Sequence, residues 1–440
     1  MTTPTSKPLS DSELACVGEE MHAWASDLFP ICRSLTGEGV RQTLACLGKL
    51  LPDLTIHEVT SGTQAFDWTV PDEWNVSEAY IENSNGERVL DFADHNLHLM
   101  GYSEPVDIEL DWEDLDKHLY SLPDQPDLIP YTTSYYKRRW GFCLTHRQRE
   151  AMPAGRYRAV VRSTLQAGSL TYGELILPGT STDEVLLSTY ICHPSMANNE
   201  LSGPVVTTAL VRWLASLPER RLTYRIVFIP ETIGSLVYLS RNLATMKERT
   251  VAGFVITCVG DERSYSMLGS RLGATKADRV AAHVLDHAVE KWMAYSFHER
   301  GSDERQYCAP GVDLPVVSVM RSKYGTYPEY HTSADDLSLI TPAGLAGSLR
   351  VLSQCLQVLE ADGRYRVTTL GEPQLGKRAL YPTLSAKGSA DAVRDMMNLI
   401  AYADGTRDLV GLAEAAKVPA IDAIAIVRKL IEHGLFENMG

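Results

Sequence analysis

Three polar segments follow apolar runs that are typical of buried strands, and each carries a side chain that a hydrolase could use. His193 and Glu231 stand directly at the ends of two such runs, and His331 lies in a polar loop after a third. Neutral imidazole is a common zinc ligand, and a carboxylate near a metal and an apolar strand can act as a general base. These residue types, in this order, indicate a metal-dependent hydrolytic site.

Each segment alone also has an ordinary structural explanation. Asn198 or Asn199, in the loop after His193, suits the cap of a following helix. Glu231 could be an acidic residue that the helix dipole favours in a first turn. Asp335 could cap the next helix or orient the His331 ring beside a metal. The functional interpretation therefore depends on the order and spacing of the three segments on one scaffold.

That scaffold is expected to alternate strands and helices. Apolar runs and helical periodicity predict elements at 185–192, 204–217, 224–230, 235–243, 251–260, 277–292, 315–320 and 342–359, after two helices at 14–28 and 40–51. The alternation predicts an α/β fold in which a mixed sheet is flanked by helices. In such sheets ligand sites lie at the carboxyl ends of the strands, which is where the three polar segments stand.

Two regions differ from this alternating pattern in composition and are expected to be separate domains. Residues 56–172 contain short aromatic runs broken by Asn-Gly and by prolines, which predicts an inserted β-rich domain whose aromatic residues form a core. Residues 376–440 show a helix, a short helix, a longer helix and a glycine-led apolar turn, the pattern of a winged helix. The α/β domain is then discontinuous and comprises 1–55 and 173–375.

The motif order resembles the zinc aminopeptidase family, whose members carry two metal ions beside a mixed sheet. That family has a strand-end His, an Asp-Asn-x-Ser-Gly loop, Glu-Glu-x-Gly after a strand, an Asp after the next strand and a late His-Thr-x-x-Asp. This chain supplies His193, then 199–203 as Asn-Glu-Leu-Ser-Gly, 231–234 as Glu-Thr-Ile-Gly, and 331–335 as His-Thr-Ser-Ala-Asp. With its winged-helix tail the chain also resembles an aminopeptidase-like group associated with polysaccharide-biosynthesis genes.

The departures from the family pattern concern its metal ligands. The bridging Asp falls on Asn199 and the second Glu on Thr232, while the later Asp falls near Thr257. An amide binds zinc more weakly than a carboxylate because it carries no charge. The resemblance therefore implies one zinc ion rather than two, with the metal residues His193, Asn199, Asp303 and His331; Asp303 is the preferred carboxylate, ahead of Glu200 and Asp261.

The resemblance implies a metal-dependent hydrolase of a peptide or amide bond. Glu231 aligns with the family's general base. Arg305, Tyr307 and Tyr324, with Lys323, are candidates for binding the substrate or its oxyanion, and structural pairing is the alternative role for all four. A small peptide or amide, free or linked to a sugar, is the expected substrate. The competing hypothesis is a catalytically degenerate aminopeptidase-like protein that binds or regulates.

Composition restricts the partners. The 440 residues are 44% hydrophobic and 22% charged, with a formal net charge of −15, which is typical of an acidic globular protein and argues against broad phosphate-backbone binding. The tail carries Arg428 and Lys429 but more acidic than basic residues, so we expect it to make a protein contact or a homo-oligomer rather than bind nucleic acid.

The compartment is expected to be the cytoplasm. The N-terminal residues are polar and lack the basic start and apolar run of a secretory signal, and no stretch of eighteen apolar residues predicts a membrane span. The eight cysteines form no C-x-x-C pair and no zinc-finger spacing. They are expected to be isolated, mostly buried thiols.

Overall fold

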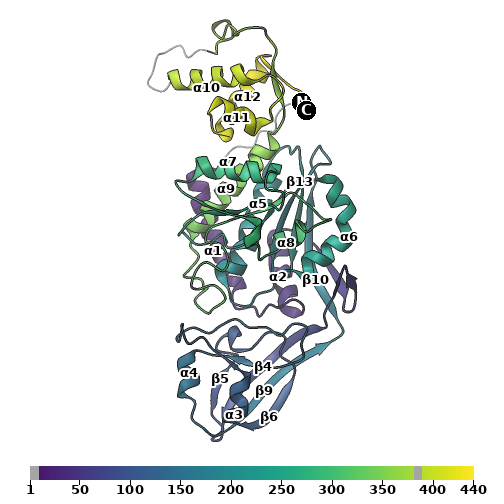
Figure 1. The fold of residues 1–440 in the computed structure, drawn as a ribbon, viewed down its shortest axis with the longest axis vertical. Helices are drawn as coiled ribbons and strands as arrows, with labels where there is room; N and C mark the ends of the chain where they lie inside the picture. Colours follow the sequence, from purple (N-terminus) through teal and green to yellow (C-terminus); the bar gives the residue numbers. More distant parts are fainter. Residues whose placement is uncertain (1–8, 381–388) are drawn as a thin grey trace.

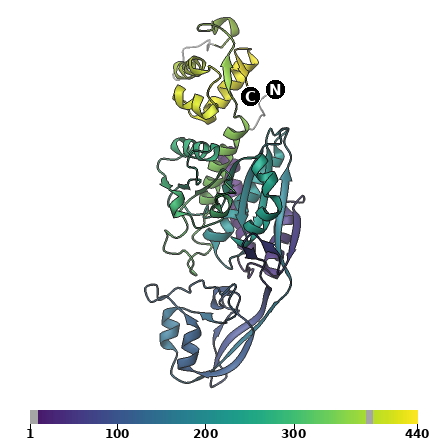
Figure 2. The same ribbon diagram turned by 45° about the vertical axis from the view of Figure 1, so that its right-hand side comes forward.

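The computed structural model describes residues 9–380 and 389–440, which form three units stacked along the long axis of the molecule (Figure 1). The middle unit is built around an eight-stranded sheet, a four-stranded sheet lies at one end, and a helical unit with a small hairpin lies at the other. The same separation is visible from a second side in Figure 2. The predicted fold class, a mixed sheet flanked by helices with a β-rich insert and a C-terminal winged helix, is confirmed.

The central sheet is mixed. Its strands lie in the order β1 (Thr55–Thr60), β10 (Ser169–Leu177), β12 (Thr223–Ile229), β11 (Glu184–Tyr190), β13 (Thr250–Val255), β16 (Val316–Met320), β14 (Ser266–Leu268) and β15 (Met293–Tyr295). β11 runs parallel to both β12 and β13, and β13 runs parallel to β16. The carboxyl ends of these four strands therefore meet at one edge of the sheet.

Strand alternation explains why the central strands are apolar throughout. On β11, Val185 and Leu187 join the core on one face, while Leu186 joins the core on the other. Both faces are covered, because successive side chains of a strand point in opposite directions. The first face carries α1 (Asp11–Leu28), α2 (Glu38–Leu50), α5 (Ser202–Ser216), α7 (Lys276–Ala288) and α9 (Pro342–Glu360), and the second carries α6 (Ile233–Arg249) and α8 (Glu304–Tyr307).

Some predicted limits were too long. The strand expected at 251–260 ends at Val255, after which the backbone bends and Cys258 takes a φ of 52°. The helix expected at 277–292 ends at Ala288. Residues 256–260 stay buried in a loop, so hydrophobicity alone did not mark the end of that strand, whereas residues 289–292 after the helix are exposed or half-buried.

The β-rich unit contains a four-stranded antiparallel sheet with the order β5 (Arg88–Asp91), β4 (Glu73–Asn83), β9 (Arg156–Gln166) and β6 (Val106–Asp111). Short helices α3 (Trp112–Leu115) and α4 (His146–Ala151), with the small strand pairs β2–β3 (Gln64–Ala65, Trp68–Thr69) and β7–β8 (Leu119–Tyr120, Phe142–Cys143), complete it. Its core includes Trp74, Trp140 and Phe142. β1 and the first four residues of β10, which fell within the predicted insert of 56–172 except for Thr55, pair instead in the central sheet.

The C-terminal unit consists of α10 (Ser389–Tyr402), α11 (Leu409–Ala416) and α12 (Ala420–Glu432) with a hairpin of β17 (Tyr365–Val367) and β18 (Phe436–Asn438). Since β17 pairs with β18, the unit includes strand residues that precede the predicted boundary at 376. It shares a core with the α/β unit, and α12 packs against α9 and α7.

Within the described residues, no helix has the length and apolar character needed to cross a membrane.

Candidate active site

The loops that follow the four parallel strands adopt an unusual backbone. Ser195, Thr232, Cys258 and His331 have φ values of 45°, 64°, 52° and 57°, in the left-handed region that non-glycine residues rarely occupy. One of these residues follows each of β11, β12, β13 and β16. Backbone strain of this kind persists where the surrounding structure enforces a particular side-chain arrangement. Here the strained residues lie at the edge of the sheet that was predicted to hold the site.

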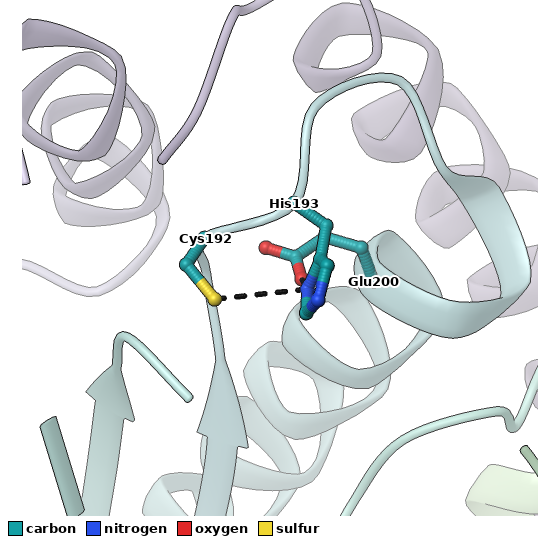
Figure 3. A group of neighbouring side chains, drawn as sticks. All are labelled: Cys192, His193 and Glu200. Atoms are coloured by element: carbon teal, nitrogen blue, oxygen red, sulfur yellow. Dashed lines mark hydrogen bonds and ion pairs between the residues drawn. The ribbon is translucent and has the colours of Figure 1, made fainter. Parts of the chain in front are cut away.

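His193 is fixed by its neighbours (Figure 3). Its Nδ1 lies 2.7 Å from Glu200 Oε2 and 3.6 Å from Cys192 Sγ, and its carbonyl accepts a 2.9 Å hydrogen bond from the buried Arg33 Nε. Arg33 Nε is also 3.7 Å from Glu200 Oε1. The contact on Nδ1 sets the ring orientation and leaves Nε2 facing Glu231 Oε2 at 3.7 Å.

Among the described residues, Cys192, His193 and Glu200 are the one group of three potential ligand residues whose ligand atoms all lie within 4.8 Å of one another. The separation of 2.7 Å between Nδ1 and Oε2 is a hydrogen-bond distance. Burial raises the pKa of the Cys192 thiol to about 11, so it is protonated and a poor ligand at neutral pH. This group is therefore a hydrogen-bonded support for His193, which places Glu200 behind the ring, in the orienting role rather than in that of a ligand.

Glu231 and Asp303 form an acidic pair behind the turn after β12. Asp303 Oδ1 accepts hydrogen bonds from Thr232 N at 2.7 Å and Ser235 Oγ at 2.8 Å, and Oδ2 is buried with no donor among the described residues. Burial, followed by the nearby Glu231 carboxylate, raises the pKa of Asp303 to about 7. Burial also raises the pKa of Glu231, against the opposing effect of His193 and Arg305.

His331 completes a group of three rings with Tyr131, which comes from the β-rich unit. The Tyr131 ring centroid lies 5.3 Å from that of His193 and 5.1 Å from that of His331, and the two histidines are 5.5 Å apart. Tyr330 stacks on His331 at 3.9 Å. Burial, followed by the charge of His193, lowers the pKa of His331 to about 3, so its imidazole is neutral at neutral pH.

The loop of the insert is tied to the loop that carries His331. Tyr131 N donates to His331 O at 2.8 Å, and Ile129 exchanges two hydrogen bonds with Ser333, of 2.9 and 3.0 Å. The Tyr131 hydroxyl lies 2.9 Å from that of Tyr135. Both tyrosines pack against hydrophobic clusters, as predicted for the aromatic residues of the insert, and Tyr131 in addition lies against the two histidines.

Asn199, Asp335 and Asp261 are engaged in structural contacts. Asn199 Oδ1 accepts from Tyr190 OH at 3.1 Å. Asp335 accepts from the backbone amides of Asn198 and Asn199, at 2.6 and 3.0 Å, and so caps the π-helical turn Ala197–Leu201. Asp261 accepts four hydrogen bonds, from Ser322 N, Ser322 Oγ, Asn198 Nδ2 and Arg263 N, between 2.9 and 3.1 Å, so both of its oxygens are occupied.

The predicted substrate residues occupy different positions. Arg305 is half-buried and donates from Nη2 to Thr232 Oγ1, next to Glu231. Tyr307 is fully buried and its hydroxyl lies 2.9 Å from Ser188 Oγ within the sheet, a core position that gives a substrate no access. Tyr324 is also buried; its hydroxyl donates to Glu304 and accepts from Gly301 N. Of these three predicted substrate residues, the structure places only Arg305 beside the carboxylates.

Sequence reasoning missed two residues of the site. Tyr131 meets His193 and His331 only through contacts between residues that are far apart in the sequence, and a single tyrosine in an aromatic-rich segment does not indicate such contacts. Arg33 lies between α1 and α2, where the fully buried guanidinium holds Leu28 O and His193 O. The sequence signal that could have indicated Arg33 is a charged residue in the connection between two predicted helices with apolar faces.

The fold and the strand-end arrangement define an aminopeptidase-like chain with a winged-helix unit. The chain belongs to the family described as Domain of unknown function (DUF4910), which matches residues 22–362, and residues 363–438 match a winged helix-turn-helix family.

Similarity to Clostridium acetobutylicum extends over almost the whole chain. A protein provisionally named polysaccharide biosynthesis protein with aminopeptidase-like domain is 42% identical over 400 residues, 90% of this chain and 91% of its own length. The crystal structure of a provisionally assigned peptidase superposes with a TM-score of 0.91 at 39% identity, covering 97% of this chain and 98% of that one.

More distant structures share the fold. A zinc aminopeptidase from Bacillus subtilis has a TM-score of 0.56 at 12% identity, over 77% of this chain and 94% of its own. At this identity the likeness concerns the fold alone.

Proposed function

We propose that this chain hydrolyses a peptide or amide bond with the help of one zinc ion held at His193 and His331. The observation that supports this most directly is the setting of His193, whose Nδ1 is held by Glu200 while Nε2 faces Glu231 at 3.7 Å. A ring nitrogen oriented by a carboxylate on its opposite side is the usual arrangement of a metal-binding histidine.

The residues present fit one ion better than two. His331 is neutral at neutral pH and so has a lone pair to offer, and Asp303 has a buried oxygen, Oδ2, without a donor. By contrast Asn199 has an uncharged amide already bonded to Tyr190, and Thr232 has a hydroxyl bonded to Arg305. We therefore assign His193, His331 and Asp303 to the ion, and leave Asn199 as a weak additional ligand.

Glu231 is proposed as the general base. A bound zinc ion would lower the pKa of a water molecule and polarise the substrate carbonyl. Glu231 would take a proton from the attacking water molecule and return it to the nitrogen of the leaving amine, so that the C–N bond is replaced by a C–O bond. Its raised pKa, which burial causes, brings its proton affinity nearer to neutral pH, where general-base catalysis is most effective.

The test is a comparison of Glu231→Gln and His331→Ala for zinc content and for turnover of a small amide library. Glu231→Gln is expected to keep the ion and to lose about a hundredfold to ten-thousandfold in rate, the usual contribution of a general base. His331→Ala is expected to lose both. His298→Ala, on an exposed residue outside the site, is the matched control and should change neither.

Two results would contradict this assignment. If Glu231→Gln strips the ion as fully as His331→Ala does, Glu231 is a ligand and not the base. If the wild-type protein holds zinc but turns over no amide in the library, the hydrolase proposal fails.

That second result would favour the alternative function, a degenerate aminopeptidase-like protein that binds or regulates. The neutral Asn199 and Thr232 support this alternative, because they remove two of the charged ligands of the family pattern. Three residues of the family pattern, His193, Glu231 and His331, are nevertheless present and lie close together. For that reason we prefer the hydrolase function.

The substrate and the compartment are parts of the same proposal. The name of the Clostridium acetobutylicum relative refers to polysaccharide biosynthesis, which supports a sugar-linked amide as substrate. All eight cysteines are free, which supports a reducing compartment, the cytoplasm.

A further inference from the structure

A guanidinium group stands where the aminopeptidase pattern has a carboxylate. Thr232 follows Glu231 directly, at the position of the second Glu in the family motif. The short Thr232 side chain leaves room for Arg305, whose Nη2 donates to Thr232 Oγ1. The electrostatic effect of Arg305 reaches Glu231, whose pKa it lowers in opposition to burial. A fixed positive charge therefore lies beside the proposed general base.

The guanidinium of Arg305 has N–H donors for which the described residues provide no acceptor. Among the residues that the structure describes, the one hydrogen-bond acceptor of the Arg305 side chain is Thr232 Oγ1, and this side chain takes part in no ion pair; its Nε is buried without an acceptor. A guanidinium has five N–H donors in a planar fork, and a buried donor without a partner is costly. Most arginines of this acidic chain are paired; Arg225, for example, bridges Glu174 and Glu184.

Lys323, a buried cation in the loop after β16, is in a different situation. Its Nζ donates to Tyr324 O at 3.2 Å and lies 4.2 Å from the centroid of the Tyr324 ring. Its charge is thus accommodated by groups of the fold, whereas the fork of Arg305 is not. A structural counter-ion for Glu231 would be expected to contact that carboxylate directly, and no such ion pair is formed.

We propose that Arg305 binds a carboxylate group of the substrate, so that the site takes amides with a free carboxylate near the scissile bond, of the N-acylamino-acid type. This inference rests on the proposed hydrolase function and names the substrate class of the same site. A planar fork matches a carboxylate in a bidentate manner. A substrate with a free α-amino group would instead need carboxylates to receive its ammonium, and two of those of the family pattern are the neutral Asn199 and Thr232 here.

The test is a binding experiment that does not depend on turnover. N-acetylglycine, its neutral amide N-acetylglycinamide and the cation glycinamide are titrated calorimetrically into the full-length protein, both metal-free and loaded with zinc. We expect N-acetylglycine to bind at least tenfold more tightly than either of the others, which corresponds to about 1.4 kcal/mol. The metal-free arm separates binding by Arg305 from binding by an ion.

Two variants and a control assign the preference to the residue. Arg305→Met should abolish the tenfold preference, and Arg305→Lys should reduce it, because an ammonium keeps the charge but loses the fork. Arg300→Met removes an exposed arginine from the same segment and should leave it unchanged. Thermal unfolding of each variant verifies that it is folded.

The inference is overturned if glycinamide binds as tightly as N-acetylglycine, or if folded Arg305→Met keeps the preference. Failure of the hydrolase proposal gives a different pattern. In that case N-acetylglycine still binds through Arg305, but no amide is cleaved by the zinc-loaded protein.

Discussion

Lowering the pH from 7.5 to 5 is expected to weaken the contact between α7 and the first turn of α12. Ala420 N donates a 2.9 Å hydrogen bond to His283 Nε2, which can accept only while the ring is neutral. Burial, followed by the charge of His287, lowers the pKa of His283 from 6.5 to about 4, with Asp286 acting in opposition and Arg279 adding to the effect.

The sign follows from linkage. The folded-state pKa of His283 lies below the unfolded-state value, so the unfolded chain takes up the proton first as the pH falls. The stabilisation is complete above 6.5, is lost as the pH falls toward about 4, and changes no further below that. This interval corresponds to at most about 3 kcal/mol of unfolding free energy, of which about 2 kcal/mol is lost at pH 5.

The assay is urea unfolding of the full chain at pH 7.5 and pH 5, compared between the wild type and His283→Gln. A glutamine oxygen can accept the same N–H but does not titrate, so the difference between the two proteins isolates His283 from all other titrating groups. His298→Gln, at an exposed position, is the matched control. If His283→Gln loses as much stability on acidification as the wild type, the reasoning is refuted.

Three further predictions concern the metal, the insert and the tail. Elemental analysis of the purified protein should find about one zinc ion per chain, and two ions at full occupancy would contradict the one-ion site. Tyr131→Ala should lower kcat/KM about tenfold, the scale of an aromatic contact, with zinc retained, whereas Trp68→Ala at an exposed position of the same unit should not; equal effects would remove Tyr131 from the site. Residues 378–440 should not bind duplex DNA at physiological salt, alone or in the full chain, and sub-micromolar, salt-sensitive binding in fluorescence anisotropy would show otherwise.

Much of the fold could be predicted because its signals are local. The apolar runs of β11, β12 and β16 end in polar residues, and parallel strands bring such ends together wherever they occur along the chain. His193, Glu231 and His331 could be proposed as a group for this reason. The limits of the insert were harder to place, since β1 and β10 are strands like those of the insert and only their pairing assigns them to the central sheet.

The details of the site depend on contacts that no local pattern carries. Glu200 was a candidate ligand from its place in the motif, but the π-helical turn directs it to His193 Nδ1. Tyr307 and Arg305 are two residues apart on one short helix, α8, so their side chains point in different directions, one to Ser188 in the sheet and one to Thr232. Their spacing alone did not say which of them faces the site.

The docking of α12 has a consequence for any partner of the C-terminal unit. In helix-turn-helix proteins the first residues of the second helix contact the bases, and the corresponding residues here begin at Ala420, which is buried against α7. A nucleic acid or protein that needs this turn would compete with α7 for it, and its apparent affinity would be reduced by the free energy of that contact. By reciprocity, such a partner would also loosen α7, a helix that covers the sheet holding the candidate site. Binding of such a partner would therefore couple the winged helix thermodynamically to the α/β unit, because α7 and the partner would compete for the same surface of α12.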